Sequence, residues 1–382
     1  MDEYTRHQKI WKVLWHLVHR PLCRRFRFTC DELNYDGPCL LISNHVTNWD
    51  PLLLAMSLRK HQAYFVASEH IFRQGIISKI LLWLLGPIAR KKAGSAAATV
   101  MDCMRHLSQG HSIVLFAEGD CTWDGETQPV FPATGKLAKR CGAALVTYRL
   151  EGGYFSFPRW GKRQRRGRMH GRIVHIYTPE QLKGMKPDEI TQVINRDLYE
   201  NAWTRQQEEP VVYRTGRPAE CLESSLFLCP SCGKFSGLRS RKDTLFCSCG
   251  ASWKVSFDGK FTPAEPFADV ASWDHWQSEA LEEAVKRAGD PLFSDTDVEF
   301  TCIEEDGSSK KCRTSVVQHP DFLEVAGEQI AEKDISDMAI IKNRILVFSG
   351  KRHYYEVRMK KGGNVRKYLA YLHLSHSEAS EQ

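Results

Sequence analysis

The chain has 382 residues, of which 42% are hydrophobic and 26% are charged. This composition is typical of a folded globular protein, and it excludes both a disordered chain and a chain embedded throughout in a membrane. The formal net charge of +7 favours anionic partners, such as phospholipid headgroups, nucleic acid or an anionic cofactor, without choosing among them.

The beginning of the chain does not have the form of a secretory signal peptide. Its apolar stretch is interrupted by Lys12, His16 and His19, and no small-residue cleavage site follows it. The longest other apolar run, residues 75–89, contains a Gly-Pro pair and falls short of the roughly 20 residues that a membrane span requires. We therefore expect no transmembrane helix.

Residues 1–205 alternate apolar runs that are typical of strands with stretches that are typical of helices. The strand-like runs are residues 39–43, 63–67, 112–117, 144–149 and 172–177, and the helical stretches are residues 51–58, 96–107 and 135–141. Alternation at this spacing predicts an α/β domain with a largely parallel sheet flanked by helices.

The remainder of the chain predicts two smaller parts. Residues 206–260 open with a polar connector and hold four closely spaced cysteines, which indicates a separate small module. Residues 261–382 begin with a helical stretch at 273–287 and continue as short strand-like runs with Gly-containing turns between them. These runs are residues 298–303, 322–325, 345–349, 354–359 and 367–374. The prediction is a helix followed by a small antiparallel β domain.

The four cysteines of the module form two close pairs, Cys229 with Cys232 and Cys247 with Cys249. This spacing resembles a zinc ribbon, in which four thiolates hold Zn²⁺ tetrahedrally and leave no open position, so the metal would be structural and no catalytic metal is expected. The alternative is four reduced cysteines in a core. Because the thirteen cysteines of the chain are an odd number, they favour a reduced chain on the cytoplasmic side of a membrane over a disulfide framework.

A candidate catalytic pair follows the strand-like run at 39–43. His45 comes directly after this strand, and Asp50 precedes Pro51 at the expected start of a helix. Acyl transfer from a thioester to an alcohol needs a base for the hydroxyl proton, and a neutral imidazole held by a carboxylate meets that need. The plain alternative is that Asp50 only caps the helix and His45 is a loop residue.

The block Asn44-His45-x4-Asp50 resembles the signature of the glycerolipid acyltransferase family. The Glu-Gly block of that family has its counterpart in Glu118-Gly119, which follows an apolar strand, and Arg90 matches the Arg of the middle block. A weaker likeness lies at residues 144–148, and the resemblance spans roughly residues 38–200. It implies that His45 is the general base, that Asp50 orients it, and that the acceptor is bound by Asn44, Arg90, Glu118, Gly119 and Thr122.

The chain departs from the family pattern after the Glu-Gly block. The family commonly has Thr or Asn, then Arg, then Ser, whereas this chain has Asp120, Cys121 and Thr122. The missing Arg leaves two possibilities open. Other cations could hold a phosphate, and these are Arg90, Lys91, Lys92 and Lys136. Alternatively, the acceptor has no terminal phosphate.

Two segments predict contact with anionic surfaces. Apolar residues between Ile10 and Val18 include Trp11 and Trp15, and several arginines follow them, as in an interfacial helix; the alternative is a helix that packs on its own domain. A second basic cluster lies in residues 159–172. It would attract membrane phosphates or those of coenzyme A, unless it is a solvated loop. Nucleic-acid binding is not expected, because the cluster has few aromatic residues and no recognised motif.

Together these patterns predict an acyltransferase of phospholipid biosynthesis. It would move a fatty acyl group from acyl-coenzyme A or acyl carrier protein to the free hydroxyl of 1-acyl-sn-glycerol-3-phosphate (lysophosphatidate) or a related lysolipid. We expect the chain at the cytoplasmic face of a membrane, as a peripheral or monotopic protein. The competing hypothesis is a non-catalytic lipid-binding or sensing protein, in which a degenerate acyltransferase domain senses lipid and the zinc ribbon recruits a partner.

Overall fold

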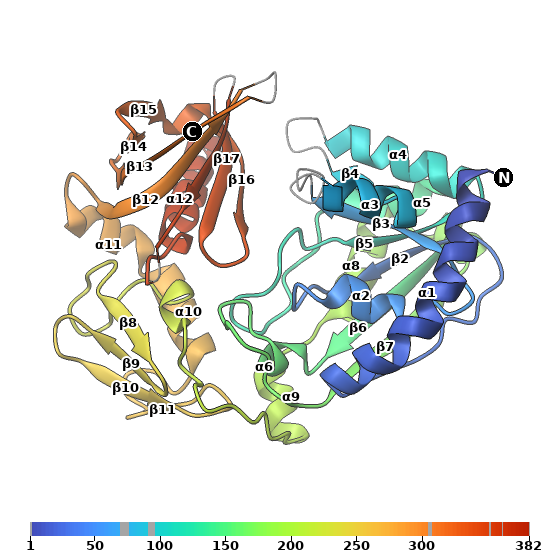
Figure 1. Ribbon diagram of the computed structural model, residues 1–382, viewed down its shortest axis with the longest axis horizontal. Helices are drawn as coiled ribbons and strands as arrows, with labels where there is room; N and C mark the ends of the chain where they lie inside the picture. The colour runs from blue at the N-terminus through green and yellow to red at the C-terminus, as the bar shows by residue number, and fades with distance from the viewer. Residues whose placement is uncertain are drawn as a thin grey trace. The chain divides into compact units, whose positions relative to one another are not determined.

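The structure is a computed structural model that describes residues 2–68, 76–90, 96–304, 308–350, 353–360 and 362–381 (Figure 1). The chain divides into two compact units. The first consists of Met1–Arg159 with Arg165–Tyr213, and the second of Trp160–Gln164 with Arg214–Gln382. The cysteine module and the antiparallel β region therefore belong to the same unit.

The described residues of the first unit form a seven-stranded sheet in the order β1-β7-β6-β2-β5-β3-β4. These strands are β1 (Phe28–Cys30), β2 (Cys39–Ser43), β3 (Ala63–Ser68), β4 (Ile88–Arg90), β5 (Ser112–Phe116), β6 (Ala144–Glu151) and β7 (Met169–Tyr177). Strand β2 is central and pairs in parallel with both β5 and β6, whereas β6 and β7 are antiparallel. The predicted α/β domain with a largely parallel sheet is confirmed.

Helices cover both faces of this sheet because its central strands are apolar on both sides. They are α1 (Glu3–Phe26), α2 (Asp50–Ala55), α3 (Ile76–Leu85), α4 (Ala96–Ser108), α5 (Ala133–Arg140), α6 (Gly153–Ser156), α7 (Pro179–Gly184), α8 (Pro187–Leu198) and α9 (Ala202–Glu208). Side chains alternate along β2, so that Leu41 packs with Leu53 of α2 in one core. Leu40 packs with Leu137 of α5 and Ile190 of α8 in the other core.

Helix α1 packs on its own unit and also has an exposed apolar side. The indole N–H groups of Trp11 and Trp15 donate to backbone carbonyls just after α2, at 2.7 and 3.1 Å. Val13 and Leu17 are 62% and 65% exposed. Within the described part of the chain, no helix combines the length and the apolar character needed to cross a membrane.

The second unit contains a small four-stranded sheet and a larger antiparallel sheet, counted over its described residues. The small sheet holds β8 (Leu238–Arg241), β9 (Thr244–Cys247), β10 (Ser252–Val255) and β11 (Phe261–Thr262). Helices α10 (Val270–Glu279) and α11 (Leu281–Ala288) follow. The larger sheet holds β12 (Phe293–Ile303), β13 (Ser309–Gln318), β14 (Phe322–Val325), β15 (Glu328–Ala331), β16 (Ile335–Ile341), β17 (Ile345–Gly350) and β18 (His353–Arg358). Its paired strands are antiparallel, as predicted.

Two details of the predicted C-terminal part are corrected by the structure. The stretch 273–287 forms two helices that meet at Ala280 instead of one. The run 367–374 is not a strand, because it lies in α12 (Arg366–Glu381). Its buried hydrophobic residues, among the described side chains, are Tyr368, Tyr371 and Leu372, and intervals of three and four residues follow the helical period.

Candidate active site

His45 and Asp50 lie at the carboxyl end of β2 and are in direct contact. Helix α2 begins at Asp50, with Trp49 at its N-cap. The Asp50 side chain is completely buried, and its Oδ2 atom lies 2.9 Å from Nδ1 of His45. Because an ionised carboxylate can only accept hydrogen bonds, Nδ1 carries the proton, and in the neutral ring Nε2 is the basic nitrogen.

The same carboxylate also fixes the turn between the two residues. Oδ2 accepts the backbone N–H groups of Val46 at 2.5 Å and Thr47 at 2.8 Å. Oδ1 accepts the hydroxyl of Thr47 at 2.7 Å. The plain alternative, in which Asp50 only begins a helix, does not describe this geometry, since the carboxylate binds the imidazole and the loop that presents it.

Cys121 lies over the face of the His45 ring. Its Sγ atom is 3.4 Å from both Nδ1 and Nε2. A sulfur in the ring plane at equal distances from both nitrogens would collide with Cε1, so it lies above the plane. The Phe116 ring also packs on the imidazole, with centroids 4.5 Å apart. These two side chains restrict rotation of the base, and the stacked thiol is not aligned to give its proton to Nε2.

The surroundings of His45 favour its protonated form. Burial acts to lower the pKa of His45, but the neighbouring Cys121 and Asp50 outweigh it, and the pKa lies well above 6.5. We attribute this mainly to the carboxylate, because burial raises the pKa of the Cys121 thiol above 9.0 and keeps it neutral. The neutral base therefore becomes the major form only as the pH rises above this pKa.

Glu118 connects the end of β5 to the backbone of the base. Its Oε1 atom accepts the N–H of His45 at 2.6 Å, and its Oε2 atom accepts the N–H of Gln128 at 2.8 Å. Burial raises the pKa of Glu118 to about 7, although the two N–H donors oppose the shift. The sequence predicted that Glu118 binds the acceptor. In the structure both of its oxygens already hold backbone N–H groups, so it also positions His45.

Gly119 and Arg90 meet at the turn after Glu118. Gly119 has a φ of +84°, and a Cβ atom there would lie 2.7 Å from the ring of Phe131, so only glycine fits. The same Cβ position is 3.6 Å from a guanidinium nitrogen of Arg90, whose side chain is exposed. The structure therefore brings Arg90 to the Glu-Gly turn. Lys91 and Lys92 lie outside the described residues.

Asn44 and Thr122 build the frame around the base. The Asn44 amide donates to the carbonyl of Leu150 at 3.0 Å and accepts its N–H at 2.7 Å, which joins β2 to β6. The N–H of Thr122 donates to the carbonyl of His45 at 3.0 Å. Its hydroxyl donates to Asp124 at 2.8 Å. Asn44 is completely buried, and in this structure both ends of its amide connect β2 to β6.

A small pocket opens beside His45. Its lining consists of His45, Val46, Thr122, Gly125, Thr127, Leu150, Gly152, Gly153, Tyr154, Glu200 and Ala202. The contributions of Gly152, Gly153 and Glu200 were not predicted from the sequence. The Gly-Gly pair directly after the apolar strand β6 was a usable signal, because paired glycines at a strand end allow a ligand to approach the backbone. Nothing near Glu200 in the sequence indicated the site.

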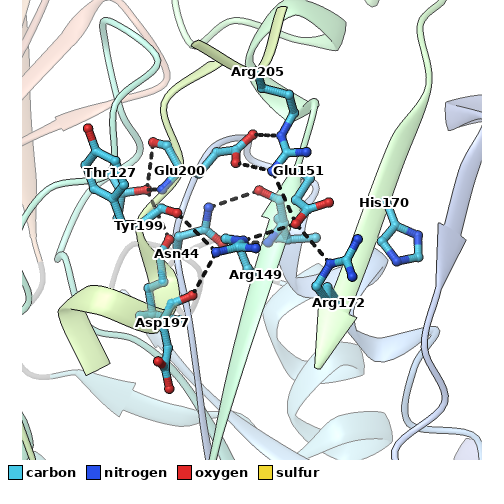
Figure 2. A network of polar contacts seen from close by, with 12 residues as sticks. Asn44, Thr127, Arg149, Glu151, His170, Arg172, Asp197, Tyr199, Glu200 and Arg205 are labelled. Atoms are coloured by element: carbon cyan, nitrogen blue, oxygen red, sulfur yellow. Dashed lines mark hydrogen bonds and ion pairs between the residues drawn. The ribbon is translucent and has the colours of Figure 1, made fainter. Parts of the chain in front are cut away.

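Glu200, which lines this pocket, also belongs to a cluster of arginines and carboxylates (Figure 2). The buried Glu151 accepts from Arg149 at 3.1 Å, Arg172 at 3.2 Å and Arg205 at 3.3 Å. Arg205 also pairs with Glu200 at 2.6 Å. Three guanidinium groups against two carboxylates leave an excess of one positive charge at the end of β6.

The predicted basic cluster at 159–172 is not simply a solvated loop. Arg172 contributes to the arginine cluster, and both Arg159 and Arg165 are buried. Arg159 pairs with Asp120 at 2.5 Å and donates to the carbonyl of Cys121 at 2.8 Å. It therefore stabilises the turn that carries the sulfur over His45.

Comparison with known proteins finds a family model and a solved structure that are similar to part of this chain. Residues 25–151 match the protein-family model described as Acyltransferase. A similar solved structure is the 1-acyl-sn-glycerophosphate (LPA) acyltransferase PlsC from Thermotoga maritima, at 14% sequence identity and a TM-score of 0.43. The likeness covers 53% of this chain and 83% of that chain. The residues that match the family model include His45, Asp50, Glu118 and Gly119, and the match supports the predicted acyltransferase domain in this region.

Proposed function

We propose that the acyltransferase domain transfers a fatty acyl group from a thioester, acyl-coenzyme A or acyl carrier protein, to the free hydroxyl of lysophosphatidate or a related lysolipid. One observation carries the proposal. The imidazole of His45 is held through Nδ1 by the buried Asp50 at 2.9 Å, and His45 lines a pocket. This is the arrangement that hydroxyl activation requires.

The reaction follows from the positions of these groups. The acceptor hydroxyl gives its proton to Nε2 of His45 while its oxygen attacks the thioester carbonyl. The new C–O bond forms, the C–S bond breaks, and the imidazolium returns the proton to the departing thiolate. Asp50 stabilises the imidazolium throughout. The backbone of Gly152 and Gly153 lines the same pocket, where amide N–H groups would stabilise the tetrahedral oxyanion.

The acceptor headgroup is assigned to the Glu-Gly turn. The exposed Arg90 lies there, beside Gly119 and Phe131, and its guanidinium suits a phosphate. Cys121 occupies the position where the family commonly has another Arg, so Arg90 is the main candidate for phosphate recognition. A lysolipid without a terminal phosphate is the second candidate acceptor, because Cys121 is buried and carries no cation.

Peripheral membrane association, at the cytoplasmic face, is part of this proposal. Helices α1 and α3 lie side by side, with Nε2 of His7 3.1 Å from the carbonyl of Trp83 (Figure 1). Among the described side chains, their exposed large apolar residues are Val13, Leu17 and Val18 on α1 and Ile80, Leu82 and Trp83 on α3. Arginines on the last turns of α1 supply positive charge. A lipid substrate and an anionic surface match this combination of apolar and basic groups.

Sedimentation with anionic phospholipid vesicles tests the membrane proposal. The doubly substituted V13E/L17E chain should lose at least about tenfold in vesicle affinity, since two charges would enter the apolar interface. Val212→Glu is the matched control, because Val212 is 61% exposed and lies outside α1 and α3. Equal binding by all three proteins would refute this surface.

The catalytic proposal is tested by incubating the purified chain with labelled acyl-coenzyme A or acyl carrier protein and a panel of lysolipids. Turnover by the natural chain and its loss in His45→Ala, with unchanged circular dichroism, is the expected result. Stoichiometric lipid binding without turnover would instead identify a lipid-sensing protein. The same panel identifies the preferred acceptor and donor.

A further inference from the structure

The four cysteines of the second unit converge on one point. Each of two loops contributes two of them. The Sγ atoms of Cys229 and Cys249 are 3.9 Å apart, and those of Cys232 and Cys247 are 3.8 Å apart. All four sulfurs lie within 4.8 Å of one another. A disulfide would bring two sulfurs to about 2.05 Å, and all four cysteines are free.

These separations have the size of a metal tetrahedron. Four sulfurs at about 2.3 Å from a central Zn²⁺ stand roughly 3.8 Å apart along each tetrahedral edge. The two measured contacts of 3.9 and 3.8 Å agree with that edge. The centre of the cluster therefore has the dimensions of one tetrahedrally bound zinc ion.

The two cysteine loops are tight backbone turns. The N–H of Gly233 donates to the carbonyl of Cys229 at 2.8 Å, and the N–H of Gly250 donates to the carbonyl of Cys247 at 3.0 Å. Each loop turns back through a glycine with positive φ, Gly233 at +66° and Gly250 at +98°.

A third glycine makes room for one of the sulfurs. A Cβ atom on Gly237 would lie 2.9 Å from Sγ of Cys247, closer than real Cβ contacts allow. Strand β8 begins at the next residue, Leu238, so this glycine lets the start of the β8–β9 hairpin pass directly beside the cluster.

A core of reduced cysteines explains these features less well. Cys249 is exposed and Cys232 is only half-buried, whereas cysteines that serve as small apolar core residues are buried. The incomplete burial of these two cysteines therefore favours ligation.

We propose that Cys229, Cys232, Cys247 and Cys249 hold a structural zinc ion through four thiolates. Four protein ligands fill the tetrahedron, so the ion has no position for substrate or water and takes no part in chemistry. This inference is independent of the proposed acyl transfer, which uses other residues of another unit.

The zinc site also supports the rest of its unit. The indole N–H of Trp273 on α10 donates to the carbonyl of Leu228 at 2.9 Å, one residue before the first cysteine. Gln277 of the same helix accepts the N–H of Phe227 at 2.9 Å. Trp253 of β10 packs on Trp273 with ring centroids 4.7 Å apart. Loss of the ion would therefore free the first cysteine loop from α10 and change the fluorescence of both tryptophans.

Metal analysis of the purified, reduced full-length chain tests the proposal. We expect close to one zinc per chain after dialysis, and Co²⁺ replacement should give the thiolate charge-transfer and tetrahedral d–d bands of a four-sulfur site. The doubly substituted C232S/C249S chain should lose at least about tenfold in zinc content. Cys312→Ser is the matched control, since Cys312 is exposed on β13 and should leave the zinc content unchanged.

A second measurement avoids dependence on a variant that fails to fold. A strong chelator should change the tryptophan fluorescence of the natural chain, and added Zn²⁺ should restore it. Less than about a tenth of an equivalent of zinc in reduced protein, iron in its place, or full zinc content in C232S/C249S would each overturn the proposal.

Discussion

Oδ2 of Asp50 contacts Nδ1 of His45 at 2.9 Å and also accepts two backbone N–H groups of the loop that presents His45. One buried carboxylate oxygen therefore orients the proposed base and stabilises the loop that carries it. This double use means that the catalytic and structural contributions of Asp50 cannot be separated by removing it entirely. A substitution that keeps its shape and removes its charge is more informative.

Asp50→Asn should lower the acyl-transfer rate by about 10²–10⁴, because an amide neither fixes the tautomer as a carboxylate does nor stabilises the imidazolium. It should also lower the free energy of unfolding by about 1–3 kcal/mol, since at least one buried N–H loses its acceptor. Transfer assays and urea unfolding measure the two effects. Asp102→Asn is the control, because Asp102 makes an exposed ion pair with Arg105. A rate within threefold of the natural chain would contradict the assigned role.

The raised pKa of His45 predicts a pH profile. Since the neutral imidazole is the base, kcat/KM should rise with pH and level off only above the folded-state pKa, which lies well above 6.5. The free energy of unfolding should change in the opposite direction and fall as the pH rises. Protonated His45 stabilises the folded state fully below pH 6.5, and this contribution is lost as the pH rises through the raised pKa.

The Cys121→Ala variant shows which neighbour of His45 raises the pKa of its imidazole. Because the buried Cys121 thiol is neutral at the pH of the assay, its removal should leave the ascending limb of the profile nearly in place. Asp50→Asn should move the limb to lower pH. A large downward displacement in Cys121→Ala alone would show that a thiolate, and not the carboxylate, holds the proton on His45.

The parts of the site that follow from strand order were predictable, and those that depend on backbone proximity were not. His45 and Glu118 each follow an apolar strand, and parallel neighbours bring their carboxyl ends to one edge of the sheet. That Glu118 would accept the N–H of His45, and that Asn44 would bind the backbone of Leu150, depends on register. The strand expected at 367–374 was wrong because a short apolar run has no unique period.

Glu118→Gln tests whether Glu118 supports the backbone of the base. Both carboxylate oxygens accept N–H groups, and an amide can accept with only one end. The variant should therefore lose about 1–3 kcal/mol of stability to one unpaired buried N–H, and kcat should fall as His45 shifts. Glu126→Gln provides a control at a nearby carboxylate. A change in acceptor KM alone, with natural stability and kcat, would instead indicate that Glu118 acts only on substrate.

Arg90 should determine recognition of the acceptor phosphate. Its guanidinium lies at the Glu-Gly turn, and loss of one charge-assisted contact of about 1.5–3 kcal/mol corresponds to roughly a 10- to 150-fold rise in KM. Arg90→Ala should show this rise with lysophosphatidate and none with the monoacylglycerol that bears the same acyl chain. Arg90→Lys should recover part of the loss, because lysine keeps the charge without the planar fork. Arg140→Ala, at the exposed end of α5, is the control. If both acceptors lost affinity equally in Arg90→Ala, Arg90 would be stabilising the turn and not binding the phosphate.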